Sequence, residues 1–277
     1  MAADKGAQDE YKQFYTEELD LPPSTKDVLV NYSNIPEGKV ESHRAKAWSI
    51  HPYPCIGMFR FCHLAIGNHA LYKSEILPRM LSGQQTYLDL GCAFAQDIRR
   101  LVADGVLSEK CYGADLRLDF LNLGYELFND RQSLKSKFIE ADIFDANSGL
   151  RELEGNIDIV DASSFFHLFR YHDQKAVARS VIKLLRPQKD SLVVGRQVGS
   201  TKPGEVNRKS GHGSMFRHDM ASWRKLWEEV GGEVGVKFQV EGELKQRDFG
   251  AKKAADQADG GEAGSIMVME FSVRRLG

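Results

Sequence analysis

Acidic side chains stand in or next to three short apolar runs, each of the length of a buried strand. Asp89 lies inside the first run, Asp115 closes the second, and Asp142 follows the third. Carboxylates gathered around one ligand disfavour a phosphate group and favour a positive charge or a hydroxyl group. These residue types therefore predict binding of a cationic ligand that carries hydroxyl groups.

The three runs belong to an alternation of strand-like and helix-like segments that begins at Thr86. Apolar residues recur at helical spacing between the first five strands. Strands are predicted at 87–90, 111–115, 137–141, 157–162, 191–198, 234–244 and 265–273. This pattern is typical of an α/β fold with a doubly wound, mostly parallel sheet. Ligands bind beyond the carboxyl ends of such strands, so we expect the aspartates to line one site.

The turn after the first predicted strand narrows the identity of the ligand. It contains Gly91 but lacks the Gly-x-Gly-x-x-Gly pattern that lets a backbone approach a pyrophosphate, which disfavours an NAD(P)-dependent reductase. S-adenosylmethionine has a sulfonium, an ammonium and ribose hydroxyls, but no phosphate. Asp115 follows Gly91 at close to the spacing of about 20 residues at which an acidic residue meets a ribose. Asp142 could accept from the adenine amino group, with Ile143 or Phe144 covering the ring. Helix capping remains an alternative role for both aspartates.

Composition excludes several partners. The 277 residues carry a formal charge of -2, so no overall field would attract nucleic acid or an anionic membrane. No apolar run has the length of a signal peptide or a membrane span, and the four cysteines lack zinc-site spacing. We expect a cytoplasmic protein with free thiols.

The chain divides by pattern into two parts. Residues 1–85 are predicted to form an amino-terminal extension with few regular periods, followed by a helical cap from residue 55, and residues 86–277 a single α/β domain. Within that domain, 199–217 is predicted to be an irregular loop and 251–264 a mobile segment. A helix is expected from Asp219 to the glycine pair at 231–232.

The motifs of the chain as a whole resemble those of class I S-adenosylmethionine-dependent methyltransferases. The resemblance is closer still to the small fungal O-methyltransferases of meroterpenoid (polyketide-terpenoid) biosynthesis. It covers residues 51–57, 88–92, 96–97, 112–117, 141–144, 164–169, 194–199 and 215–218, and the strings Phe-Phe-His-Leu-Phe and Gly-Arg-Gln-Val-Gly carry the subfamily assignment. It implies a seven-stranded sheet with an antiparallel last strand, S-adenosylmethionine as cofactor, a largely apolar acceptor with a carboxyl or hydroxyl group, and a homodimer.

Carried over by position, the cofactor residues implied by the resemblance are Asp89, Gly91, Ala114, Asp115, Asp142 and Ile143. Ala93 and Ala95 depart from the family pattern, which usually has glycine in this turn. An alanine is tolerated there only if its φ angle is negative, and otherwise introduces strain. This departure keeps open a methyltransferase-fold protein that acts as a cyclase or a non-catalytic binding module.

Methyl transfer needs alignment and exclusion of water more than covalent help. An ionised carboxyl acceptor needs no general base, whereas a hydroxyl acceptor would need a residue such as His167 after the fourth strand. A structural role for His167 among its phenylalanine neighbours is the alternative. Four further residues are predicted to contact the acceptor: His51, Arg196, Arg217 and His218. Arg196 could instead pair with Asp161 or Glu205. The acidic residues are too dispersed to predict a metal site.

Overall fold

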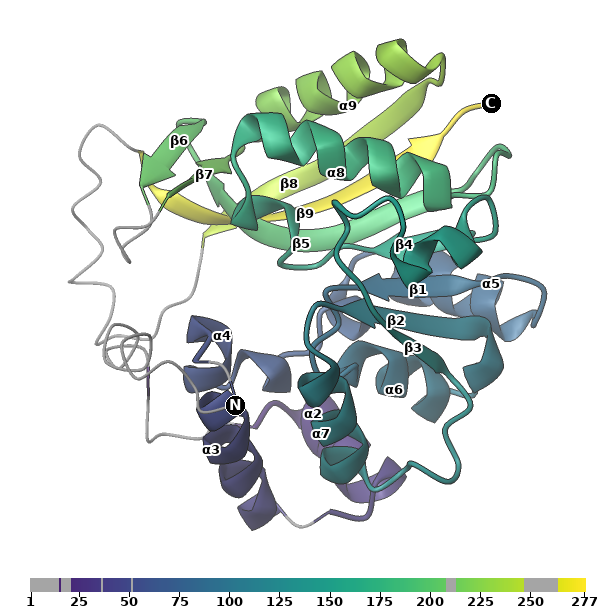
Figure 1. Ribbon diagram of the computed structural model, residues 1–277, viewed down its shortest axis with the longest axis vertical. Helices are drawn as coiled ribbons and strands as arrows, with labels where there is room; N and C mark the ends of the chain where they lie inside the picture. The colour runs from purple at the N-terminus through teal and green to yellow at the C-terminus, as the bar shows by residue number, and fades with distance from the viewer. Residues whose placement is uncertain (1–14, 16–20, 36, 51, 208–212, 247–263) are drawn as a thin grey trace. The chain divides into compact units, whose positions relative to one another are not determined.

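The computed structural model describes residue 15 and residues 21–35, 37–50, 52–207, 213–246 and 264–277 (Figure 1). The chain folds as two compact units, residues 1–142 and 143–277. This division follows backbone contacts and runs through the sheet. The boundary predicted at residue 85 lies elsewhere, between the sheet and the segment that precedes it.

The seven strands of the main sheet follow the order β3-β2-β1-β4-β5-β9-β8. Their bounds are β1 Tyr87–Leu90, β2 Cys111–Asp115, β3 Lys137–Glu140, β4 Ile159–Asp161, β5 Leu192–Ser200, β8 Phe238–Gln246 and β9 Ile266–Arg275. Within the units, β1, β2 and β3 pair in parallel, as do β4 and β5, whereas β9 is antiparallel to both β5 and β8. The predicted α/β fold with an antiparallel last strand is confirmed.

Two helices of the first unit pack against its strands. These are α6 (Gln96–Ala103) and α7 (Leu118–Phe128), and both contact β2 (Figure 1). Ile98 and Leu101 of α6 and Leu121 of α7 are buried, as their helical spacing predicted, whereas Leu118, predicted on the same face, is exposed. Because each helix begins just beyond the end of a strand, both amino termini stand at the edge where the aspartates were expected.

The segment before the sheet contains more regular structure than predicted. It forms α2 (Pro23–Asp27), η2 (Val28–Tyr32), η3 (Glu37–Lys39), α3 (Val40–Ile50), α4 (Pro54–Gly57), η4 (Arg60–Cys62), η5 (Ile66–Asn68), η6 (Tyr72–Ile76) and α5 (Leu77–Leu81). The sequence shows few regular periods before residue 50, yet α3 forms a helix of 11 residues there. Among its described side chains only Val40 and Ala47 are buried, which is too few to produce a clear helical period.

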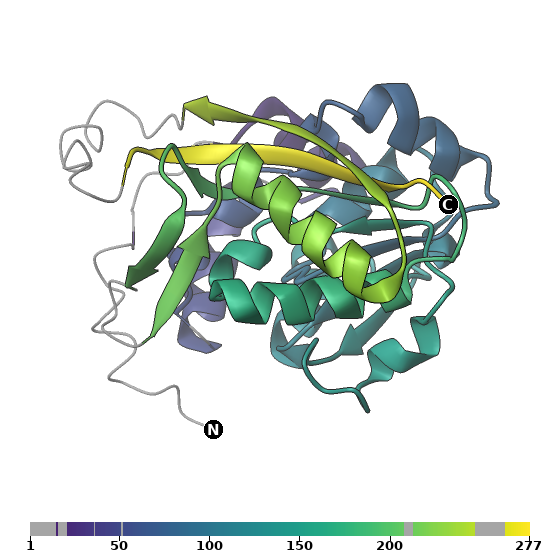
Figure 2. The same cartoon turned by 90° about the horizontal axis from the view of Figure 1, so that it is seen from above.

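Two helices of the second unit lie side by side over one face of β5, β8 and β9 (Figures 1 and 2). These are α8 (Tyr171–Leu184) and α9 (Met220–Val234). Asp219 begins α9 through a capping box with Ser222. The helix runs past the glycine pair at 231–232, where an end was predicted, and stops at Gly235, whose φ of 71° suits a left-handed cap. A glycine inside a helix costs only about 1 kcal/mol, which burial of Trp223, Trp227 and Val230 readily offsets.

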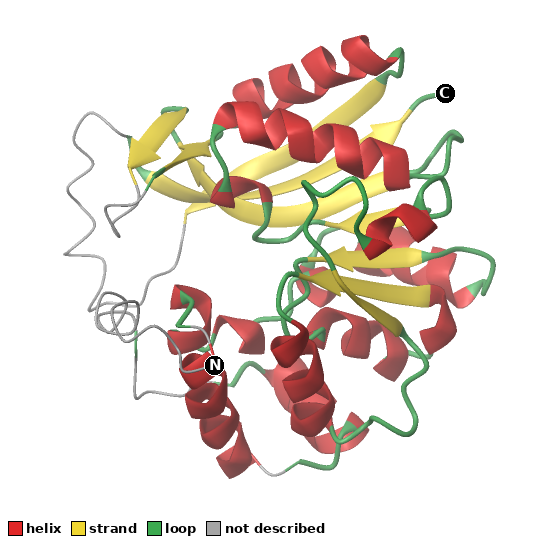
Figure 3. Cartoon of the chain, in the orientation of Figure 1, coloured by secondary structure: helices red, strands yellow, loops and turns green. Residues whose placement is uncertain are grey.

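The segment 199–217 is not an irregular loop throughout, as had been predicted. It contains a two-stranded antiparallel hairpin, β6 (Gly204–Asn207) and β7 (Ser214–Arg217), drawn as two short yellow strands in Figure 3. The Phe216 N–H donates to the Phe169 carbonyl at 2.8 Å, which attaches the hairpin to the chain just after η9 (Phe166–Leu168). Four-residue strands of mixed polarity give no clear alternation in the sequence. The predicted mobile segment 251–264 lies, except for Gly264, outside the described residues.

Candidate functional site

Asp115 connects the turn after β1 to the start of α7. Its Oδ2 accepts from the Ala93 N–H at 2.8 Å, and its Oδ1 accepts from the Arg117 N–H at 2.9 Å. Burial raises the pKa of this carboxyl above its usual value, although these backbone donors lower it in part. The carboxylate, which is half-buried, is therefore partly desolvated. Ligand hydroxyl groups that donate to it would offset part of that cost.

The turn itself has three residues with positive φ. Gly91 has φ 77°, Ala93 48° and Ala95 53°. The two alanines that replace the family's usual glycines thus have left-handed backbone conformations. Such a conformation costs a residue with a Cβ about 1 kcal/mol. Non-glycine residues held in such conformations concentrate at functional sites. The strained turn and the partly desolvated carboxylate lie next to each other.

The remaining cofactor candidates of the first unit differ in exposure. Asp89 is 5% exposed within β1, and Ala114 is 1% exposed beside it in β2. The Ala114 carbonyl accepts from the N–H groups of Gly91 and Cys92, at 2.8 and 3.1 Å. Ala114 therefore acts on the turn through its backbone. Asp142 is exposed at the end of this unit, and Ile143, which is buried, begins the next.

Tyr53 and Arg117 are neighbours of Asp115 that the site prediction did not include. The Tyr53 hydroxyl is hydrogen-bonded to the Arg117 side chain. Burial raises the Tyr53 pKa, although the hydrogen bond and the charge of Arg117 lower it in part. Its ring packs on Phe120 with centroids 5.8 Å apart. Both residues lie inside motifs that carried the family resemblance, which was the available signal. His51, the predicted acceptor contact two residues earlier, lies outside the described residues.

His167 lies in η9 of the second unit, in a segment that backbone N–H groups attach to β5. Its N–H donates to the side-chain oxygen of Gln197, which is 3% exposed in β5, at 3.1 Å. Ser164, three residues earlier, has a φ of 56° and donates its N–H to the Arg196 carbonyl at 2.7 Å. The connection after β4 is thus strained and held against β5. His167 is half-buried there.

The two alternative partners proposed for Arg196 make backbone contacts of their own. Asp161 accepts from the Ser163 N–H at 2.9 Å. Glu205 accepts from the Tyr171 N–H at 3.1 Å and from the Ser214 hydroxyl at 2.9 Å. Both carboxylates therefore stabilise the connections that follow β4 and β5.

His218 is inside the second unit, 1% exposed. Its Nε2 lies 2.8 Å from the Gln174 side-chain oxygen and its Nδ1 2.9 Å from the Ser222 hydroxyl. Burial lowers its pKa to about 3, so the ring is neutral. Gln174 also donates to the carbonyls of Phe169 and Phe216, at 3.0 and 2.9 Å. These contacts are those of a structural histidine and do not fit the predicted acceptor contact.

Arg217, the neighbouring residue, is half-buried, and burial lowers the pKa of its guanidinium. Its buried Nε finds no hydrogen-bond acceptor among the described residues. A desolvated positive charge of this kind favours an anionic ligand.

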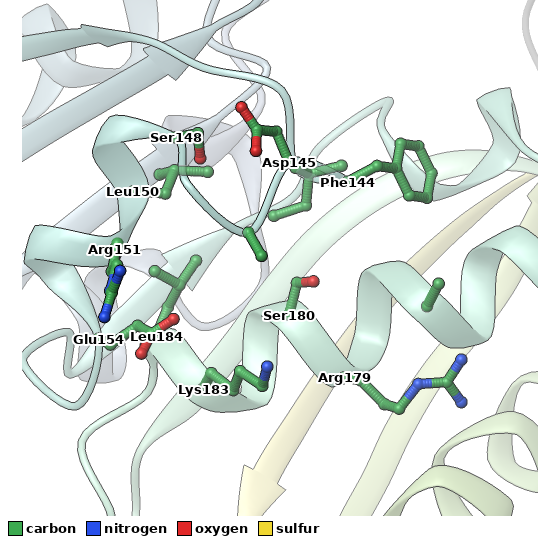
Figure 4. Close-up of a pocket in the computed structure, with 13 residues that line it drawn as sticks. Phe144, Asp145, Ser148, Leu150, Arg151, Glu154, Arg179, Ser180, Lys183 and Leu184 are labelled. Carbon is green, nitrogen blue, oxygen red and sulfur yellow. The ribbon is translucent and has the colours of Figure 1, made fainter.

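A cavity of about 290 Å³ in the second unit lies between η8 (Gly149–Leu153) and α8 (Figure 4). Its wall includes Arg151, Glu154, Arg179 and Lys183, and Arg179 also pairs with Glu233 at 2.8 Å. Among the predicted site residues only Ile143 lines it. The cavity thus begins at the 141–144 motif and extends along α8.

Three further observations concern the described part of the chain. It contains no group of three or more His, Cys, Asp or Glu side chains placed to hold a metal ion. The four cysteines are free, as predicted. No described helix is both long and apolar enough to cross a membrane.

Several curated proteins similar to this chain are methyltransferases. The family described as "Meroterpenoid methyltransferase N-terminal domain" matches residues 14–62. The O-methyltransferase phiE of a fungal species (strain ATCC 74256) is 43% identical over 228 residues, which cover 80% of this chain and 76% of phiE. The asnovolin E/chermesin D methyltransferase nvfJ of Aspergillus novofumigatus is 39% identical over 221 residues, covering 78% of this chain and 79% of nvfJ.

A solved structure shares the fold. The 1,6-didemethyltoxoflavin-N1-methyltransferase of Burkholderia thailandensis, with bound S-adenosylhomocysteine, is similar at a TM-score of 0.52 and 10% identity, over 95% of this chain and 93% of that one. The fold is that of a class I S-adenosylmethionine-dependent methyltransferase. On its identity to the curated relatives, the chain belongs to the S-adenosylmethionine-dependent methyltransferases of fungal meroterpenoid biosynthesis, the family that its motifs predicted.

Proposed function

We propose that this methyltransferase is an O-methyltransferase that transfers the methyl group to an oxygen, preferably a carboxyl oxygen, of a meroterpenoid intermediate. The observation that carries the proposal is the partly desolvated Asp115 carboxylate, bonded to a strained turn that has a single glycine. Asp115 would accept from the ribose hydroxyls. Asp142 and Ile143 would contact the adenine, and Asp89, Gly91 and Ala114 would shape the turn.

The donor supplies an electrophilic methyl group, and the protein must orient the acceptor and exclude water. Two carboxylates next to the turn, Asp89 and Asp115, suit a ligand with a positive sulfur and a positive amino group. Tyr53 and Arg117, hydrogen-bonded to each other beside Asp115, would limit the access of water there.

A carboxyl acceptor is favoured by the positive side chains of the second unit. Arg217 has a buried Nε that lacks an acceptor within the described residues, so an anionic substrate group would offset its desolvation. Arg196 adds a second positive charge on β5. If the acceptor is a hydroxyl group instead, His167 would serve as the general base. His218 is proposed to position the hairpin rather than to contact the acceptor.

Isothermal titration calorimetry on Asp115→Ala tests the cofactor site. We expect the dissociation constant for S-adenosylmethionine to rise by about 10- to 100-fold, since hydrogen bonds to a charged acceptor are lost. Glu109→Ala is the matched control, because it removes the same charge just before β2, at the opposite end of that strand from Asp115. An unchanged affinity in a folded Asp115→Ala protein would remove the basis of the proposed site.

The strain at Ala93 and Ala95 favours one other function, that of a cyclase or a binding module which retains the fold. Incubation with methyl-labelled S-adenosylmethionine and a panel of farnesylated aromatic acids separates the two. Label in a methyl ester supports the transferase, and binding of both ligands without transfer supports the alternative.

The assembly proposed from the family resemblance is a homodimer. The apolar and aromatic residues between 48 and 66 offer it little surface, because Ile56, Phe59, Phe61 and Leu64 are buried in the core. Native mass spectrometry would report the subunit number and any retained cofactor together. A monomer at micromolar concentration would contradict this part of the proposal. A cytoplasmic location likewise stays a prediction.

A further inference from the structure

We propose that Tyr32 is a positioning residue for cofactor binding, acting on the turn after β1 through Asp130 and Arg99. The inference rests on the proposed function of that turn as the cofactor site. The segment before the sheet thereby helps to set the affinity for the cofactor, in addition to packing over the core.

Arg99 is the central member of this chain of contacts. It lies on α6, is 0% exposed, and its Nη1 donates to the carbonyls of Phe94 and Ala95 at 2.7 and 3.2 Å. The guanidinium therefore binds two successive carbonyls of the turn. One of them belongs to Ala95, which has the left-handed φ of 53°. Fixing these carbonyls holds the turn in its strained conformation before any ligand binds.

Asp130 orients the guanidinium. Its two carboxylate oxygens accept from Nε and Nη2 of Arg99 at 2.7 and 2.9 Å, in a bidentate pair that is 4% exposed on the Asp130 side. The Arg99 guanidinium carbon also lies 4.5 Å from the ring centroid of Phe128. A bidentate pair fixes the plane of the guanidinium. The direction of Nη1 toward the turn follows from that plane.

Tyr32 completes the chain from the last residue of η2. Its hydroxyl donates to Oδ2 of Asp130 at 3.0 Å, the same oxygen that accepts from Nε of Arg99. Burial, together with the charge of Asp130, raises the Tyr32 pKa, so the phenol stays protonated and donates. Loss of this hydroxyl would leave Asp130 with one orienting contact fewer and would loosen Arg99 and the turn.

Helix α6 also takes part in a second chain of contacts, made by the same three residue types, that leads away from the turn. The Tyr72 hydroxyl donates to Asp104, and Asp104 pairs with Arg100 near the carboxyl end of α6. Arg100 also pairs with Asp27 at 2.6 Å. Each chain thus joins a tyrosine before the sheet, a carboxylate and an arginine of α6. Of the two, the Tyr32 chain is the one that reaches the carbonyls of the turn, through Arg99.

The experiment compares Tyr32→Phe with Tyr72→Phe, which remove the same hydroxyl from the two chains. For Tyr32→Phe we expect the dissociation constants of S-adenosylmethionine and of S-adenosylhomocysteine to rise about three- to tenfold by calorimetry. For Tyr72→Phe we expect a comparable loss of thermal stability with both constants within about twofold of the parent protein. Arg99→Lys, which keeps the charge but loses the fork, should weaken both ligands at least as much as Tyr32→Phe.

Equal cofactor affinities in the two tyrosine variants would overturn the inference, since a purely structural role changes stability alone. The Asp115→Ala measurement separates the two proposals. If Asp115→Ala binds normally, the proposed cofactor site is wrong. If it binds weakly while Tyr32→Phe binds normally, only the positioning role is lost.

Discussion

Gly124 of α7 approaches the carbonyl oxygen of Phe94 so closely that a Cβ at this position would lie 2.6 Å from the oxygen. The contact lets α7 pack directly against the turn whose carbonyls Arg99 also binds. Gly124→Ala should therefore displace the turn. We expect a loss of about 1–3 kcal/mol in the free energy of unfolding and weaker binding of S-adenosylmethionine.

Chemical denaturation and calorimetry check this expectation. Gly232→Ala is the control, because it lies in a helix where nothing stands within 4 Å of an added Cβ. That substitution should leave cofactor affinity unchanged and stabilise α9 by up to about 1 kcal/mol. A stabilised Gly124→Ala with normal affinity would show that α7 adjusts without moving the turn.

Ala95→Gly should stabilise the protein slightly. Its φ of 53° strains an alanine by about 1 kcal/mol, and glycine relieves the strain while adding a smaller entropy to the unfolded chain. We expect chemical denaturation to show a free energy of unfolding higher by about 0.5 kcal/mol. Ala103→Gly, at the carboxyl end of α6, should lower the free energy of unfolding by up to about 1 kcal/mol. Equal losses for both variants would contradict the proposed strain.

His218 should make stability depend on pH in mildly acidic solution. Burial lowers its folded-state pKa to about 3, below the usual 6.5, so between these values the unfolded chain binds a proton that the folded chain does not. Stability from this residue is present above about pH 6.5 and declines as the pH falls toward 3. From pH 6.5 to 5 we expect a loss of about 1.5 kcal/mol.

The measurement is the free energy of unfolding against pH for the parent protein and for His218→Gln, whose decline should be shallower by that amount. His172→Gln, on the exposed side of α8, is the control and should keep the parent slope. Parallel curves for all three proteins would mean that His218 takes up its proton without unfolding.

His167→Ala distinguishes the two acceptor types. With a carboxyl acceptor, turnover should be retained and the pH profile should be flat above about pH 6, because the acceptor is already ionised. With a hydroxyl acceptor, the variant should lose most of its turnover. Rates across pH for parent and variant decide between them. Lost turnover together with a flat parent profile would indicate a positioning role.

The strands and the acidic strand ends were predictable because their signals are local. Tyr87–Leu90 and Cys111–Asp115 are continuous runs bounded by turn residues, and the structure has them at the same positions. Asp115 could be singled out for the same reason. The sign of φ at Ala93 and Ala95 could not be predicted, because it depends on how α7 and Arg99 hold the turn.

Contacts between distant residues were not predictable from periodicity. Tyr32 and Asp130 are 98 positions apart, and no spacing rule connects them. His218 was expected to contact the acceptor because it follows a loop in the sequence. It is instead buried against Gln174, which is 44 positions earlier and belongs to α8. The hairpin was missed because its strands are only four residues long.

Gln174 bonds to the carbonyls of both Phe169 and Phe216, so the connection after β4 and the hairpin after β5 share one anchor. Replacing only one of these segments with that of a relative would therefore leave it without matching contacts to the segment that is kept. Chimaeras built to alter acceptor preference should exchange both segments together with the glutamine and the histidine that join them.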